Sequence, residues 1–208
     1  MTNTNFTTIA RRIQTLALTA ALLVAGTACT GSGDDPGQRV TPTSSSPTAS
    51  TRSTDTEVVS EAVSGIVRQY FATVDALRQD PKGSSGELTA VAASTQFAAQ
   101  KKLLLSQRKQ GFQQIGDTKV IELEVQSVSL DNSDPAAGRV PTAIVDVCWD
   151  VGDVDVVNDD GDSVVSPDRV AIGWTRLTVA NYAWASDPTG GWRIAGGEDL
   201  KKAPCEAS

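Results

Sequence analysis

The stretch at residues 146–162, DVCWDVGDVDVVNDDGD, gathers seven aspartates and one asparagine around a cysteine and a tryptophan. Carboxylates at this density could bind a cation or take part in acid–base catalysis. They could also line the solvent side of a strand and its turn. The residue types around the stretch discriminate between these three interpretations.

Metal binding is the first interpretation, and the spacing argues against its common forms. An EF-hand loop needs oxygen ligands at positions one and twelve. With Gly161 at position six, those positions hold Val156 and Pro167. The chain has no histidine and Cys148 has no second thiol nearby, so we expect no zinc centre and no cofactor. A looser calcium site at the turn stays open, with three carboxylates: Asp159, Asp160 and Asp162.

Acid–base catalysis is the second interpretation, and the missing histidine removes the side chain best suited to proton transfer near neutral pH. A lone carboxylate could still act if burial raised its pKa. Asp75, between Val74 and Leu77, is the best candidate by position. The alternative is an ordinary solvent-facing aspartate on a helix. We therefore predict no catalytic residue.

The third interpretation, a strand and its turn, fits the alternation best. Asp146, Cys148 and Asp150 share one face, and the valines and Trp149 share the other. The sequence NDDG at residues 158–161 is typical of a hairpin turn, because Asn, Asp and Gly tolerate positive φ. We expect the aspartates to mark a solvent face and a hairpin tip.

The N-terminal part of the chain lacks the pattern of a folded domain. Arg11 and Arg12 precede an apolar run at residues 13–28, which is typical of an export signal and short for a membrane span. Residues 29–56 are rich in Ser, Thr and Pro and have few apolar side chains, so they are predicted to form a disordered tether. The net charge of −7 argues against nucleic acid as a partner.

The end of the apolar run, AGTAC at residues 25–29, resembles the lipobox of bacterial lipoproteins. The resemblance implies cleavage before Cys29, acylation of that cysteine, and anchoring to the outer face of the cell membrane. Two or more acyl chains anchor stably. If Cys29 carries lipid, Cys148 and Cys205 remain as an even pair in an oxidising compartment, and we expect a disulfide between them. The C-terminal tail would then fold back across the outward face of the strand.

The domain at residues 57–208 changes from helical to strand periodicity near Gly116. Apolar residues three and four apart predict a long helix ending before Pro81, and two further helical stretches follow. Alternating patterns then predict four antiparallel strands. The fold class is therefore α+β, with N-terminal helices covering one face of a curved sheet. The four predicted strands lie at residues 118–130, 141–151, 169–185 and 191–200.

This order resembles the nuclear-transport-factor-2-like (SnoaL-like, cystatin-like) family, through YFATVDAL in the first helix, the AIVDVCWD strand and the final GWRIAG strand. The layout is also similar to small secreted lipoproteins of actinobacteria. The resemblance implies a roll with a cavity between helices and sheet. Tyr182 and Trp184 are candidates to line that cavity or to contact a partner.

The expected function is non-catalytic: a lipid-anchored module of the cell envelope that binds a small apolar ligand or another envelope protein. One alternative is a lyase- or isomerase-like enzyme that uses a lone cavity carboxylate. Another is a surface lipoprotein encoded by a phage or mobile element that excludes related phages (superinfection exclusion). A solidly packed interior would exclude both small-molecule functions.

Overall fold

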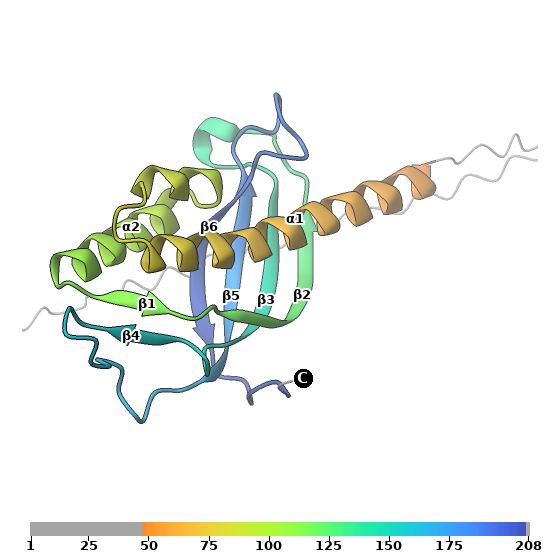
Figure 1. The fold of residues 1–208 in the computed structure, drawn as a ribbon. Helices are drawn as coiled ribbons and strands as arrows, with labels where there is room; N and C mark the ends of the chain where they lie inside the picture. Colours follow the sequence, from red (N-terminus) through yellow and green to blue (C-terminus); the bar gives the residue numbers. More distant parts are fainter. Residues whose placement is uncertain (1–47, 207–208) are drawn as a thin grey trace, which may run out of the picture. The chain divides into compact units, whose positions relative to one another are not determined.

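The computed structural model describes residues 48–206, which form an α+β domain with helices N-terminal to antiparallel sheets (Figure 1). The predicted export signal, Cys29 and the tether as far as residue 47 lie outside the described residues. No helix within residues 48–206 has the length and apolar character that crossing a membrane requires. The elements are α1 (Thr48–Gln79), η1 (Ser85–Ala90), α2 (Ser94–Lys109), β1 (Gln113–Ile115), β2 (Lys119–Ser129), η2 (Pro135–Ala137), β3 (Thr142–Asp150), β4 (Asp155–Val157), β5 (Ile172–Asn181) and β6 (Trp192–Leu200).

Helix α1 begins at Thr48, inside the segment at residues 29–56 that the sequence predicts to be a disordered tether. Residues 48–56 contain neither glycine nor proline, so the backbone can continue the helix toward the N-terminus. The helix ends two residues before Pro81, as the sequence predicts. Its apolar face lies against the sheet, and seven of its side chains are buried there: Val59, Val63, Ile66, Val67, Tyr70, Val74 and Leu77.

The segment between η1 and α2 is attached to the edge of the sheet. The backbone N–H of Ile194 donates to Val91 O at 2.9 Å, and the N–H of Ala93 donates to Ile194 O at 2.9 Å. These bonds fix the start of α2 beside β6 (Figure 1). Helix α2 ends before Gly111, whose φ of 71° suits a left-handed turn.

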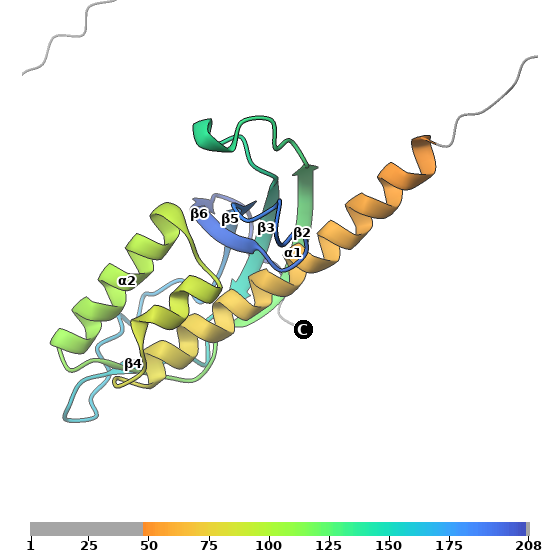
Figure 2. The ribbon, with the colours of Figure 1, turned by 90° about the horizontal axis from the view of Figure 1, so that it is seen from above.

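The main sheet is an antiparallel meander in the order β2-β3-β5-β6, and it contains all four predicted strands. Both helices lie on one of its faces, which we call the inner face (Figure 2). Alternate residues of β3 and β5 point into the core between helices and sheet. The buried side chains of the sheet in this core are Ala143, Val145, Val147, Leu177, Val179, Trp192 and Ile194.

A second sheet, not predicted from the sequence, pairs the three-residue strands β1 and β4. The predicted turn at residues 158–161 follows β4. The side-chain oxygen of Asn158 accepts from the N–H groups of Asp160 and Asp162, and Gly161 has a φ of 84°. The expectation of a hairpin tip at NDDG is therefore confirmed.

The opposite face of the main sheet, the outer face, is crossed by the C-terminal tail at residues 201–205. Cys148 and Cys205 form the expected disulfide, with Cα atoms 6.3 Å apart. The indole Nε1 of Trp174 donates to Ala203 O at 3.0 Å, and Lys202 lies over the Trp174 ring at 4.3 Å from its centroid. The tail therefore covers the outer face near the end of β3 and the start of β5.

Asp146 was expected to face solvent, and this expectation is wrong, because its exposed fraction is 1%. Arg176 donates to both of its carboxylate oxygens, at 2.7 and 3.0 Å, and Lys202 of the tail donates to Oδ2 at 2.8 Å. The Arg176 hydrogen bonds hold the pKa of Asp146 below its ordinary value. Strand alternation places Asp146 on the outer face, but it cannot show that a distant tail covers that face.

Candidate functional site

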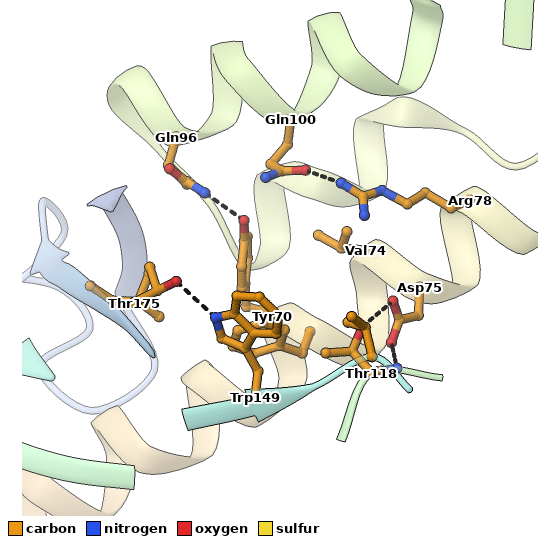
Figure 3. A pocket seen from close by; sticks show the side chains of 12 residues that line it. Tyr70, Val74, Asp75, Arg78, Gln96, Gln100, Thr118, Trp149 and Thr175 are labelled. Carbon is orange, nitrogen blue, oxygen red and sulfur yellow. Dashed lines mark hydrogen bonds between the residues drawn. The ribbon is translucent and has the colours of Figure 1, made fainter. Parts of the chain in front are cut away.

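A pocket of about 290 Å³ lies on the inner face, where α1 and α2 pass over the ends of β3 and β5 (Figure 3). Its size is near the lower end of the range of roughly 300–1,000 Å³ that is typical of ligand sites. Aromatic and aliphatic side chains form its walls, and several polar groups converge on it. The lining residues are Tyr70, Phe71, Val74, Asp75, Arg78, Gln96, Gln100, Thr118, Trp149, Val151, Thr175 and Leu177.

Arg78 supplies positive charge to the pocket from the last turn of α1. Its Nη2 donates to Gln100 Oε1 at 3.1 Å, which orients the half-buried guanidinium (Figure 3). Among the described residues, no carboxylate forms an ion pair with it. Burial lowers the pKa of Arg78, yet a guanidinium keeps its charge in proteins. The pocket therefore holds a cation without an ion-pair partner.

Tyr70 and Gln96 form a second polar pair between α1 and α2. Gln96 Nε2 donates to the Tyr70 hydroxyl at 2.5 Å. Burial raises the pKa of Tyr70, so the hydroxyl is protonated at neutral pH. Gln96 and Gln100 stand four residues apart and therefore project from the same side of α2 toward the pocket (Figure 3).

Trp149 forms the sheet side of the pocket. The alternation of β3 predicts this side chain in the core, but it is only half-buried. Its Nε1 donates to Thr175 Oγ1 at 2.9 Å, and Thr175 Oγ1 donates to Asp199 Oδ1 at 3.1 Å. The ring lies beside Gly173, where a Cβ atom would stand 2.7 Å from Trp149 Cζ2. The absence of a side chain at Gly173 therefore allows the indole ring to lie against the backbone of β5.

Asp75, the carboxylate selected from the sequence, lies in the wall of the pocket with an exposed fraction of 3%. The alternative of a solvent-facing aspartate is therefore wrong. Oδ1 accepts from Gln114 Nε2 at 2.8 Å and from Thr118 Oγ1 at 3.0 Å, and Oδ2 accepts from the Thr118 N–H at 2.7 Å. These bonds tie α1 to β1 and to the start of β2.

The other two candidates from the sequence lie elsewhere. Tyr182 is 54% exposed in the turn between β5 and β6. Trp184, in the same turn, is half-buried and packs edge-on against Trp192, with ring centroids 6.0 Å apart. Neither side chain lines this pocket.

Several lining residues were not identified from the sequence. Arg78 follows Val74 by four residues and Tyr70 by eight, so helical spacing places it on the buried face of α1. A charged residue at a position where the helical spacing predicts an apolar one is therefore the sequence signal that identifies Arg78. Thr118 and Thr175 give no such signal, because their roles depend on partners far away in the sequence.

Comparisons with known proteins give little further information. No family model matches the chain, and no curated protein matches it. Among solved structures, the chain is similar to the intermembrane-space region of the chloroplast protein ARC6, with 16% identity and a TM-score of 0.44. The similarity covers 65% of this chain and 92% of that chain. A likeness of this strength carries no argument about function.

Proposed function

We propose that this protein is a lipid-anchored component of the cell envelope whose α+β domain binds a small ligand without catalysis. The observation that carries the proposal is the inner-face pocket, in which aromatic walls meet an arginine without an ion-pair partner. Convergent polar groups in an apolar pocket are the usual form of a small-molecule site. A solidly packed interior would have argued against it.

The state of Asp75 favours binding over catalysis. A carboxylate that acts as a general base must have a lone pair within reach of its substrate. Three donors occupy the Asp75 oxygens, and all three come from the chain itself. Histidine, which could otherwise transfer protons, is absent from the sequence. Asp75 is therefore better suited to hold the pocket together than to take a proton from a ligand.

The proposal includes the nuclear-transport-factor-2-like roll as the finer description of the fold. Two features support it: N-terminal helices pack on one face of a four-stranded antiparallel meander, and a pocket lies between them. The family resemblance of the YFATVDAL, AIVDVCWD and GWRIAG segments supports it independently.

The proposed lipid anchor rests on the AGTAC sequence and the apolar run before it. The disulfide on the outer face suits an oxidising compartment. The test is Cys29→Ser in a bacterial host that processes lipoproteins. We expect the unmodified protein in the membrane fraction with acyl chains detected by mass spectrometry, and the variant in the soluble fraction. Membrane association that is unchanged in the variant would contradict the anchor.

The proposed binding activity is tested with the full chain in detergent micelles. The nuclear magnetic resonance signal of the Trp149 indole N–H, assigned with Trp149→Phe, reports directly on the pocket. We expect some members of a library of neutral and charged one- and two-ring compounds to shift this signal saturably. If no compound of the library shifts this signal saturably, the binding function is refuted.

A further inference from the structure

We infer that the pocket binds a small organic carboxylate, with its carboxylate on the Arg78 guanidinium and its apolar body against Trp149 and Phe71. This inference rests on the proposed binding function and specifies its ligand. It depends on three features of the pocket: the hydrogen bonding of its two charged side chains, the planar shape of the guanidinium, and the apolar side chains that form its walls.

The hydrogen bonding of the two charged side chains in the pocket favours an anionic ligand at Arg78. Among the described residues that line the pocket, Arg78 and Asp75 are the charged ones. The Asp75 oxygens already accept three hydrogen bonds, while Arg78 makes a single hydrogen bond, to the neutral Gln100. A half-buried charge without an ion-pair partner is partly desolvated in the empty protein, and an anionic ligand would offset the cost of that desolvation.

The donor group favours a carboxylate over a phosphate. A guanidinium presents five N–H donors in a planar fork, which matches the two oxygens of a carboxylate. One donor of Arg78 is used by Gln100, which leaves an edge of the fork for a ligand. A single cation balances the single charge of a carboxylate and would leave a phosphate dianion partly uncompensated.

The walls favour a flat or apolar body of about one or two rings, given the small volume. Trp149 is fixed by Thr175 and by the space at Gly173, so its indole is already oriented in the empty pocket. A rigid aromatic wall reduces the entropy lost on binding. The Tyr70 hydroxyl and the amide of Gln96 lie on the α2 side and can accept or donate a further hydrogen bond (Figure 3).

The test compares matched acids and amides in the full chain, with the Trp149 indole N–H as readout. The probes are benzoate and benzamide, hexanoate and hexanamide, and phenyl phosphate. We expect each acid to bind at least about tenfold more tightly than its amide, as a charge-assisted pair predicts. We also expect benzoate to bind more tightly than phenyl phosphate.

Two variants separate charge from shape. Arg78→Gln should weaken acid binding at least about tenfold and change amide binding less than about twofold. Arg78→Lys keeps the charge without the planar fork, so it should retain part of the preference for acids. The matched control is Arg139→Gln, which removes an exposed arginine before β3 that lines neither this pocket nor the hollow beside it and should leave both affinities unchanged.

The outcomes distinguish the two proposals. If acids and amides bind equally, or if Arg78→Gln leaves the preference intact, the carboxylate inference is wrong and the binding function stands. If phenyl phosphate binds best, the pocket takes an anion of another class and the inference is also wrong. If no probe shifts the Trp149 signal, the carboxylate inference is contradicted, and the binding function falls as well only if the whole compound library also gives no shift.

Discussion

Asp146 on the outer face of the main sheet is a buried charged side chain, Arg78 on the inner face is a half-buried one, and the two charges have different surroundings. On the outer face, Asp146 is held by Arg176 and by Lys202 of the tail. On the inner face, Arg78 has a neutral amide as its partner. The outer face is closed by a disulfide, whereas the inner face opens into a pocket. The ion pairs of Asp146 hold the tail on the outer face, whereas a half-buried arginine without an ion-pair partner is available for a ligand.

The largest expected effect concerns the disulfide. Replacing both Cys148 and Cys205 by alanine should lower the free energy of unfolding by about 3 to 4 kcal/mol, because the bond closes a long loop in the unfolded chain. Urea unfolding measures this loss, with Cys29→Ser as the control that leaves the bond intact. Ligand binding on the inner face should survive in the folded fraction. A double variant as stable as the control would show that the tail does not stabilise the outer face.

The next effect concerns the buried carboxylate itself. Asp146→Asn should cost about 2 kcal/mol of unfolding free energy, because hydrogen bonds between charged groups are replaced by weaker ones and two cations lose their partner. The control is Asp153→Asn, which breaks an exposed ion pair with Lys119 and should cost much less. If the two variants lose the same unfolding free energy, the burial of Asp146 does not strengthen its ion pairs.

The ion pairs of Asp146 with Arg176 and Lys202 should also make the stability of the fold depend on pH. Because the pKa of Asp146 is held below its ordinary value of 3.8, its contribution is fully present above that pH and is lost as the pH falls through the lowered value. The stability difference between the unmodified protein and Asp146→Asn should therefore shrink from about pH 6 to about pH 3. Urea unfolding at several pH values measures it. A difference that grows on acidification would contradict the assigned direction.

A smaller effect is expected at the wall of the inner pocket. Gly173→Ala places a methyl group against the Trp149 ring, which must shift at a cost of about 1 kcal/mol. The Trp149 indole signal should move, and benzoate affinity should fall several-fold. Gly65→Ala is the control, because a Cβ there meets nothing within 4 Å and should slightly stabilise α1. An unchanged Trp149 signal in Gly173→Ala would show that the ring is not fixed by that glycine.

Local patterns predicted much of the fold. The four long strands, the end of α1 and the turn at Asn158 follow from periodicity and turn chemistry, which need only neighbouring residues. The short strands β1 and β4 were not predicted, because three residues carry no measurable period. The sequence predicts no helix at residues 48–56, because their polar composition lacks the apolar spacing of a helical face, yet α1 begins at Thr48.

The candidate site was harder to predict, because its chemistry depends on contacts between distant segments. Asp75 was selected correctly as a buried position, but its three donors come from residues about forty positions away, and no local pattern shows them. The face of Asp146 was predicted, and its burial by the tail was not. Arg78 was missed even though its spacing from Val74 placed it on the buried face.

The most direct test of the contrast between the faces is urea unfolding of Arg78→Gln with and without benzoate. Without ligand, the variant should be at least as stable as the unmodified protein, to within about 0.5 kcal/mol, because it removes a partly desolvated charge that has no ion-pair partner. Saturating benzoate should raise the unfolding free energy of the unmodified protein by at least about 1.4 kcal/mol more than that of the variant, which corresponds to the tenfold difference in affinity. A variant that is several kcal/mol less stable, or one that benzoate stabilises as much as the unmodified protein, would contradict the assignment of Arg78 to ligand binding.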